Sequence, residues 1–345
     1  MRRRPATATL AALTALTALT AAVTTGCGGG DKAEPDPLRG DQWGLDALKM
    51  PDAWNTDRGD DTVIAVVDTG VDLDHPDLKG RLVDGYDFVD GDDQPKDLNG
   101  HGTHVAGIAA AHTDNGVGVA GGAPGARIMP VRVLGADGSG SDENISKGIV
   151  WAAQHGADVI NLSLGESGLM ARLLKGGVLN QAISVADSKG AVVVAAAGND
   201  STALQPYRLD TPVLVVNAAD ENGAPASFTN FGAQNAVAAP GVDILSTLPT
   251  YPAKETLRNG SGYGKLSGTS MASPYVAAVA ALLHRQGLDP AAIRKTIQDT
   301  ASNPGRLPKL GLGNVDAAAA VKAAKDAKDA KDAKDAKDAK AATDR

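Results

Sequence analysis

The stretch Val63-Ile64-Ala65-Val66-Val67-Asp68-Thr69-Gly70 decides the fold that we expect for this chain. Its apolar residues run without interruption and end at an acid followed by a turn-forming glycine. A short apolar run of this kind predicts a strand buried on both faces, as in a parallel sheet. The acid at its carboxyl end stands where such sheets hold their functional sites.

Three later segments repeat this apolar pattern, and helical segments lie between them. We expect strands within residues 157–165, 191–199 and 212–216, and helices at residues 144–155 and 169–189. Alternating strands and helices predict an α/β fold, here a single doubly wound domain with a mainly parallel central sheet and helices on both faces.

One serine lies where a loop becomes a buried helix. The run Leu266-Ser267-Gly268-Thr269-Ser270-Met271-Ala272-Ser273-Pro274 precedes residues 275–283, which are rich in Ala, Val and Leu. Ser270 would therefore stand at a helix N-terminus, where backbone N–H groups and a partial positive charge favour a developing oxyanion. The alternative is that the serine and threonine here only cap the helix.

A histidine opens a second helix of small residues, in Asn99-Gly100-His101-Gly102-Thr103-His104-Val105-Ala106-Gly107. A lone histidine is more often structural than catalytic. Here, however, an acid at a strand end, a histidine at a helix start and a serine at another helix start are available to one crevice. These are the orienting group, base and nucleophile that acyl transfer needs.

Three motifs together resemble those of the subtilisin-like serine proteases, or subtilases, in their chain order: Asp68-Thr69-Gly70, His101 to Gly107 as quoted above, and Gly268-Thr269-Ser270-Met271-Ala272-Ser273-Pro274. The resemblance covers about residues 36–322. It implies that Ser270 attacks the scissile carbonyl, that His101 takes and returns the proton, and that Asp68 orients His101.

The resemblance also implies further roles around the same cleft. Asn199 matches the oxyanion-hole amide, while His104 is expected to be a packed residue one helical turn beyond His101. A peptide would lie as an added strand between two extended edges of the chain, with one of its side chains in a first pocket. The residues implied in substrate binding are Gly138, Ser139 and Gly140, Ser163, Leu164 and Gly165, and Ala196, Ala197 and Gly198.

An acidic loop at residues 87–97 has the oxygen-rich character that a hard cation prefers. It resembles the calcium loop of thermitase-like members, which implies Asp87, Asp90 and Asp92 as ligands together with the carbonyl of Gln94. Lys96 stands where that subgroup has a neutral ligand, and Asp97 is a possible substitute. The alternative is an acidic loop that binds no ion.

A second calcium site is implied by resemblance to the family's tight position. Its side-chain ligands would be Asp36, Asp77 and Asn115, and its carbonyl ligands would come from His112, Val117 and Val119. Such a site would tie the N-terminal arm to the core. The chain has one cysteine and therefore no intrachain disulfide, so we expect one or two structural Ca²⁺ ions to take over that role.

The N-terminus has the basic start and short apolar run of an export signal. Residues 1–27 resemble a bacterial lipoprotein signal that ends at Cys27, the residue that would be lipidated; the alternative is a soluble secreted protein cut nearby. Residues 28–35 read as a linker, residues 36–322 as the peptidase domain, and residues 323–345 as a low-complexity tail of Lys-Asp-Ala repeats, expected to be a solvated, partly helical spacer.

Composition limits the classes of function. The net charge of −8 argues against nucleic acid as a partner, because phosphate binding requires basic clusters. The resemblance implies a serine endopeptidase acting on proteins or peptides, and with the export signal we expect it to be extracytoplasmic and monomeric, with the membrane reached only through a lipid on Cys27. The start of the domain also resembles the mycosin branch. The competing hypothesis is a protease-fold binding module that has lost catalysis.

Overall fold

The computed structural model describes residues 34–164, 177–203, 207, 210–233, 235–260 and 262–343. Within them seven strands form one sheet in the order β2-β3-β1-β4-β5-β6-β7, and every neighbouring pair is parallel. The strands are β1 (Val63–Asp68), β2 (Tyr86–Asp87), β3 (Arg127–Arg132), β4 (Val159–Leu162), β5 (Val192–Ala196), β6 (Val213–Ala219) and β7 (Val237–Pro240).

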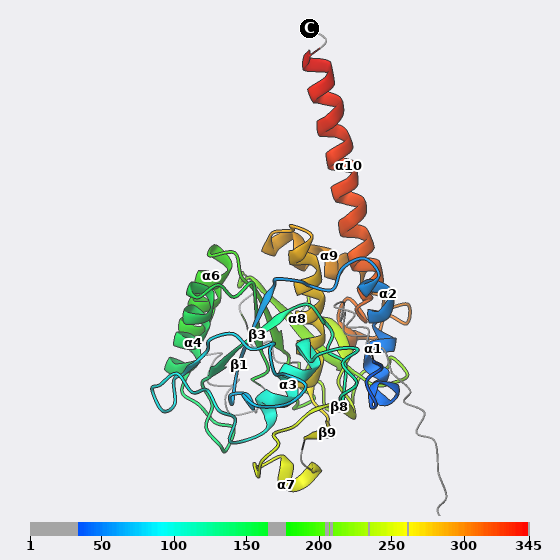
Figure 1. The fold of residues 1–345 in the computed structure, drawn as a ribbon. Coiled ribbons are helices and arrows are strands. Elements are labelled where there is room, and N and C mark those ends of the chain that lie inside the picture. The colour runs from blue at the N-terminus through cyan, green and yellow to red at the C-terminus, as the bar shows by residue number, and fades with distance from the viewer. Residues whose placement is uncertain are drawn as a thin grey trace, which may run out of the picture. The chain divides into compact units, whose positions relative to one another are not determined.

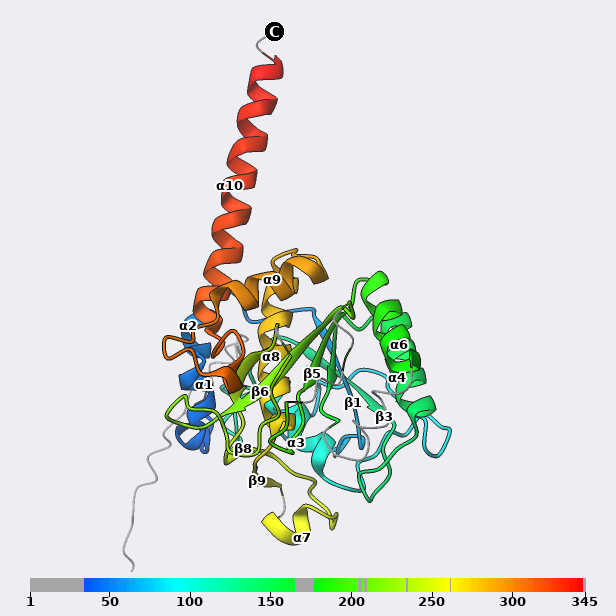
Figure 2. The same ribbon diagram turned by 180° about the vertical axis from the view of Figure 1, so that it is seen from behind.

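Helices cover both faces of this sheet (Figures 1 and 2). On one face lie α3 (His101–Ala110) and α8 (Thr269–Arg285), and on the other lie α4 (Asp142–Gln154) and α6 (Gly177–Ser188). The alternation of side chains along β1 serves both layers, because Ile64 and Val66 join the first core cluster while Ala65 and Val67 join the second. The predicted doubly wound α/β architecture is confirmed.

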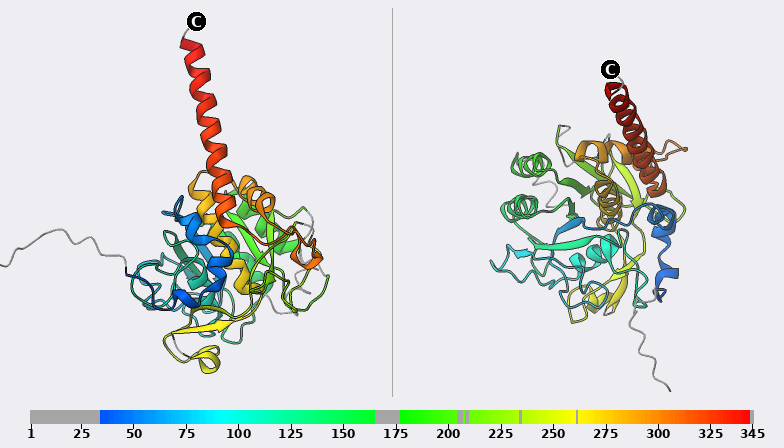
Figure 3. Two further views of the ribbon diagram at one scale, coloured as in Figure 1. Left: turned by 90° about the vertical axis from the view of Figure 1, so that its right-hand side faces the viewer. Right: turned by 45° about the horizontal axis from the view of Figure 1, so that its top comes forward.

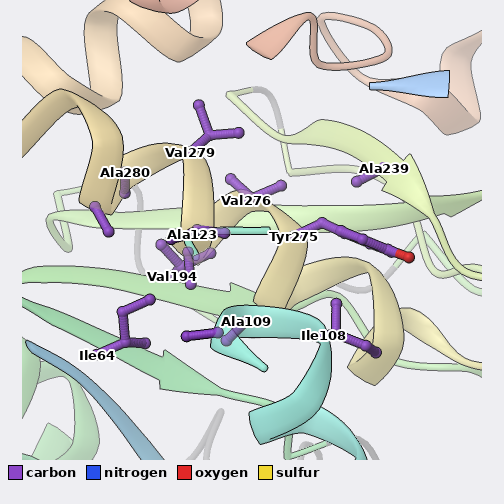
Figure 4. Packing of buried hydrophobic residues seen from close by; sticks show 14 of the residues in the cluster. Ile64, Ile108, Ala109, Ala123, Val194, Ala239, Tyr275, Val276, Val279 and Ala280 are labelled. Carbon is purple, nitrogen blue, oxygen red and sulfur yellow. The ribbon is translucent and has the colours of Figure 1, made fainter. Parts of the chain in front are cut away.

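Helix α8 is the centre of the larger core. It is buried over its first fifteen residues, from Thr269 to Leu283. Figure 4 shows Tyr275, Val276 and Val279 of this helix among Ile64 and Val194 of the sheet and Ile108 of α3. Small residues allow this close helix-on-sheet packing, which explains how a core can be built with only 3% aromatic residues.

Smaller elements surround these layers: η1 (Arg39–Asp41), α1 (Trp43–Ala47), α2 (Met50–Trp54), the antiparallel pair β8 (Ile244–Thr247) and β9 (Tyr263–Leu266), α7 (Thr256–Asn259), α9 (Pro290–Thr300) and η2 (Pro308–Leu310). The last helix is α10 (Ala317–Thr343), red in Figure 3. Its first turns bury Ala317, Ala320, Val321 and Ala324, whereas residues 325–340 are exposed. No helix in the described part of the chain is both long and apolar enough to cross a membrane.

The predicted elements match the structure closely. The four expected strands appear as β1, β4, β5 and β6, and the expected helix at 144–155 is α4. Part of the expected helix at 169–189 is α6, while residues 169–176 lie outside the described residues. The export signal, with Cys27, and most of the linker also lie outside them.

Candidate active site

An acid and a histidine meet at the carboxyl end of the central strand. Asp68 is the last residue of β1 and His101 is the first of α3; the Nδ1 atom of His101 lies 2.7 Å from Oδ1 of Asp68. The same Oδ1 accepts a 2.7 Å hydrogen bond from the backbone N–H of Thr69. A side chain at position 102 would prevent this approach, because a Cβ on Gly102 would lie 2.1 Å from the carbonyl oxygen of Gly70.

The buried carboxylate of Asp97 fixes the start of α3. One oxygen accepts hydrogen bonds from the Thr69 hydroxyl and from the backbone N–H groups of Asn99 and Gly100, at 2.8, 2.9 and 2.8 Å. The other accepts from the backbone N–H and the hydroxyl of Thr103, at 2.8 and 2.6 Å. Both oxygens thus serve the start of α3, and a role for Asp97 as a calcium ligand stays a prediction.

Ser270 is the second residue of α8 and exchanges two hydrogen bonds with Ser163. Its hydroxyl donates to the Ser163 carbonyl at 3.2 Å, and the Ser163 hydroxyl donates to the Ser270 carbonyl at 2.8 Å. Within α8 that carbonyl would bond residue 274, but Pro274 has no N–H. Two further hydrogen bonds continue this network: Asn161 Nδ2 donates to Ser163 Oγ, and Ser273 Oγ donates to Asn161 Oδ1.

The side-chain amide of Asn199 is oriented by the first residue of α8. Its oxygen accepts hydrogen bonds from the backbone N–H and the hydroxyl of Thr269, at 2.9 and 3.1 Å. Its Nδ2 lies 3.5 Å from the position that a Cβ on Gly268 would occupy. The amide nitrogen is thus held on the approach to the N-terminus of α8, beside Ser270.

One cleft brings most of the predicted residues together. His101, Ser270 and Asn199 line it, as do the predicted edge residues Gly138, Ser139, Gly140, Ser163 and Leu164. Asp68 lies beneath His101 and is fully buried. Ala196 and Ala197 are buried at the end of β5, where the Ala197 carbonyl accepts a hydrogen bond from Asn230 and Gly198 donates to Thr269. Gly165 lies outside the described residues.

The two histidines of α3 differ in their electrostatics. Burial lowers the pKa of His101, but the negative charge of Asp68 and its hydrogen bond outweigh this effect, so the pKa lies above its ordinary value. The side chain of His101 remains 24% exposed, enough to reach a substrate. Burial lowers the pKa of His104 to about 3, and its Nε2 contacts the carbonyl of Gly264 at 3.1 Å. His104 is therefore a neutral, packed residue.

The residues expected to form the tight calcium site lie together around one buried carboxylate. Asp77 accepts hydrogen bonds from Asn115 Nδ2 and from the backbone N–H of Val119, at 3.0 and 2.8 Å. Burial raises the pKa of Asp77. Asp36 accepts from the backbone N–H groups of Asp114 and Asn115, which ties the N-terminal arm to this loop. A buried acid held by neutral donors, with an amide beside it, fits a hard cation.

The acidic loop fits a cation less well. Asp87 and Asp90 both contact the buried guanidinium of Arg132, so their charge already has a partner. Asp92 accepts a hydrogen bond from the backbone N–H of Gln94, and the Gln94 carbonyl accepts from Lys96. Throughout the described part of the chain, no group of three or more His, Cys, Asp or Glu side chains is placed to hold a metal. Calcium in this loop stays a prediction.

Several residues of the site were not identified from the sequence. Lys254 and Glu255 line the cleft, although they belong to the segment between β8 and β9. Asn161 and Asp97 act from behind the cleft through hydrogen bonds. Only Asp97 left a detectable signal, since it is an acid shortly before a helix start, where a negative charge is favourable; the N-cap itself is Gly100. The partners of the other residues are distant in sequence.

A doubly wound sheet with an acid, an imidazole and a hydroxyl at one edge is typical of serine hydrolases. The sequence pattern of the subtilase family matches residues 59–335. The chain therefore belongs to the subtilase family of serine proteases, as its motifs suggested.

Individual relatives agree with this assignment. The chain is 44% identical over 283 residues to thermitase from Thermoactinomyces vulgaris, an alignment covering 81% of this chain and 96% of that protein. It is 47% identical over 266 residues to the thermophilic serine proteinase of Bacillus sp. (strain AK1), covering 76% of this chain and 62% of that protein. A solved structure of proteases from Pseudoalteromonas arctica PAMC 21717 superposes with a TM-score of 0.73 at 35% identity, covering 85% of this chain and all of that one.

Proposed function

We propose that this protein is a serine endopeptidase that hydrolyses peptide bonds through Asp68, His101 and Ser270. The observation that carries the proposal is the 2.7 Å contact between His101 and a buried carboxylate, in a cleft that Ser270 also lines. Burying an ionised carboxylate is costly unless it is paired, so the burial of Asp68 beneath His101 favours a functional role for this pair.

In the proposed reaction, the Ser270 hydroxyl leaves the Ser163 carbonyl and donates to Nε2 of His101. Its oxygen then attacks the substrate carbonyl while His101 takes the proton, so that a C–O bond forms as the carbonyl π bond opens onto oxygen. His101 gives that proton to the departing amine as the C–N bond breaks. Water repeats the sequence on the acyl-enzyme. Asp68 holds the imidazole orientation and stabilises its charged form.

We further assign Asn199 as a donor to the oxyanion that forms during attack. Thr269 holds the oxygen of this amide, and Nδ2, its donor end, lies close to Gly268 at the N-terminus of α8, near Ser270. The N-terminus of α8 adds backbone dipoles of the same sign. Removing one donor of this type costs about 10²- to 10³-fold in kcat.

The second candidate function is a catalytically inactive binding module, and covalent labelling distinguishes it from an active peptidase. A fluorophosphonate probe should label the wild-type protein and leave the Ser270→Ala variant unlabelled. The Ser184→Ala variant is the matched control, because this serine is exposed on α6 and its hydroxyl donates only to the backbone carbonyl of Asn180. Wild-type protein that folds but fails to react would reject the peptidase and favour the module.

The proposed setting is extracytoplasmic, with protein or peptide substrates and a lipid on Cys27 as the membrane anchor. The proposal rests on the basic and apolar character of residues 1–27 and on the single cysteine at their end. Metabolic labelling with a fatty-acid analogue tests it. Wild-type protein should carry the label and the Cys27→Ser variant should not; an unlabelled wild type would favour a soluble secreted form.

We also propose that Ca²⁺ stabilises the fold at the Asp77 group. Asp36, Asp77 and Asn115 would hold the ion with the carbonyls of His112, Val117 and Val119, supplying hard oxygen ligands. The ion would offset the unfavourable burial of Asp77, whose pKa is raised. Excess EDTA should therefore lower the melting temperature of the Ser270→Ala protein by many degrees, and much less for an Asp77→Asn variant. Identical melting curves with and without EDTA would remove the site.

A further inference from the structure

The segment between β8 and β9 is fastened across the entrance of the active-site cleft. The backbone N–H and hydroxyl of Thr250 both donate to Asp72, at 2.9 and 2.8 Å. The Tyr251 hydroxyl donates to the carbonyl of Asp97 at 2.8 Å. The backbone N–H of Glu255 donates to the carbonyl of Asn99 at 2.8 Å. Two of these bonds reach Asp72, just after β1, and two reach Asp97 and Asn99, in the loop that leads into His101.

This attachment carries Lys254 into the wall of the cleft. Its ammonium group donates to the backbone carbonyl of Asp137 at 3.1 Å. The Nζ atom lies 4.0 Å from the position of a Cβ on Gly138, one of the predicted substrate-binding edge residues. Both Lys254 and Gly138 line the cleft. A cationic group is thus fixed directly beside the edge along which a peptide would lie.

The neighbouring acids are engaged elsewhere. The carboxylate of Asp137 accepts hydrogen bonds from the backbone N–H and hydroxyl of Ser139, at 2.9 and 2.7 Å. Glu255 is 15% exposed, and its carboxylate lies 3.6 Å from the guanidinium of Arg258. Each carboxylate thus has its own partner, and Lys254 is the cationic group fixed beside Gly138.

The geometry of an extended peptide identifies the substrate residue concerned. Successive side chains of a strand point to opposite faces. If the side chain of the residue whose carbonyl meets Ser270 points toward the predicted first pocket, beside Ala196 to Gly198, the preceding side chain points to the opposite wall. Asn99 and Lys254 lie beside Gly138 and line the cleft together with His101, so we take these residues as that opposite wall.

We propose that Lys254 makes this enzyme prefer substrates with an acidic side chain at the residue immediately before the one whose carbonyl is attacked. The inference rests on the proposed peptidase activity and adds a substrate class to it. A half-exposed pair of opposite charges contributes modestly, and a like-charged pair costs a similar amount.

The test uses fluorogenic peptides that differ only at that position, which carries Asp, Ala or Lys. At low ionic strength the wild-type kcat/KM should be about three- to tenfold higher for Asp than for Lys. This ratio should fall toward one in Lys254→Gln, invert in Lys254→Glu, and shrink in high salt. Lys265→Gln is the matched control, because Lys265 is exposed on β9 and does not line the cleft.

The outcomes separate this proposal from the proposed function. An enzyme that cleaves all three peptides with the same Asp-to-Lys ratio before and after Lys254→Gln would overturn the role of Lys254 and leave the peptidase intact. A protein that cleaves none of them, and that no fluorophosphonate labels, would overturn both.

Discussion

The carboxylate of Asp97 gives the sharpest prediction, since it joins Thr69, directly after β1, to the first residues of α3. The Asp97→Asn substitution keeps the shape of the side chain but turns one acceptor oxygen into a donor. Asp97 accepts five hydrogen bonds, so either orientation of the new amide faces at least one buried backbone N–H with another N–H. The Thr103 and Thr69 hydroxyls can rotate to accept, whereas backbone groups cannot.

The expected loss follows from these donors. Each buried donor left without an acceptor costs about 1–3 kcal/mol, and the substitution leaves one or two such donors. The remaining hydrogen bonds also lose their charge-assisted character, so the free energy of unfolding should fall by about 2–5 kcal/mol. This corresponds to a fall in melting temperature of roughly 5–15 °C for a domain of this size. Thermal unfolding by circular dichroism measures it, in the Ser270→Ala background so that self-cleavage does not interfere.

The control is Asp84→Asn, which removes an exposed carboxylate in the same half of the chain. It should leave the melting temperature within about 1–2 °C of the parent, as surface substitutions do. If Asp97→Asn melts as close to the parent as this control does, then the hydrogen bonds around Asp97 do not hold the helix, and the account of how His101 is positioned is wrong.

Four further predictions concern the pH profile of activity, the pH dependence of stability, the support of Ser270 and the tail. Because Asp68 raises the pKa of His101 above 6.5 and catalysis needs the neutral imidazole, the acidic limb of kcat/KM should lie above pH 6.5. The carboxylate of Glu255 also raises this pKa, so the limb should move to lower pH in Glu255→Gln. A limb that does not move would exclude an effect of Glu255 on His101. The charged His101–Asp68 pair contributes stability below pH 6.5 that is lost as pH rises through the folded-state pKa, so the melting temperature of the Ser270→Ala protein should decline across that range. In Asn161→Ala the fold decrease in kcat should be about ten times the fold increase in KM, because the substitution removes the hydrogen bond that supports Ser163 and removes no substrate contact. Asn180→Ala, a substitution on α6 away from the cleft, is the control. Truncation after Ala324 should leave activity and melting unchanged, whereas truncation after Asp316 should unfold or strongly destabilise the protein, since only the latter removes Ala317, Ala320, Val321 and Ala324 from the core.

The sequence was sufficient for the parts of the fold that depend on local pattern. Uninterrupted apolar runs identified β1, β4, β5 and β6, because a strand buried on both faces leaves no polar alternation. The three motifs placed Asp68, His101 and Ser270 at element ends, and parallel topology made one shared edge the natural outcome. The tail was expected to be partly helical and is helical over its whole described length.

The parts that could not be predicted depend on contacts between distant residues. Lys254 reaches the cleft only because its segment bonds to Asp72, Asp97 and Asn99, none of which has a local pattern linking it to residues 250–255. Likewise, an acidic loop reads as a metal site until Arg132, more than forty residues away, is found between Asp87 and Asp90. Composition describes the charge of a loop, but only the fold says which charge it faces.

Contacts between distant residues also explain how Ser270 is positioned. A proline four residues after a nucleophile on a helix would be expected to weaken the helix, since it removes one hydrogen bond of the first turn. Here the carbonyl that loses its helical partner belongs to Ser270 itself, and Ser163 from the end of β4 donates to it. The break in the helix thus becomes a bond between α8 and the sheet edge. In this way the serine is positioned by the two elements that also form the walls of the cleft, and not by its own helix alone.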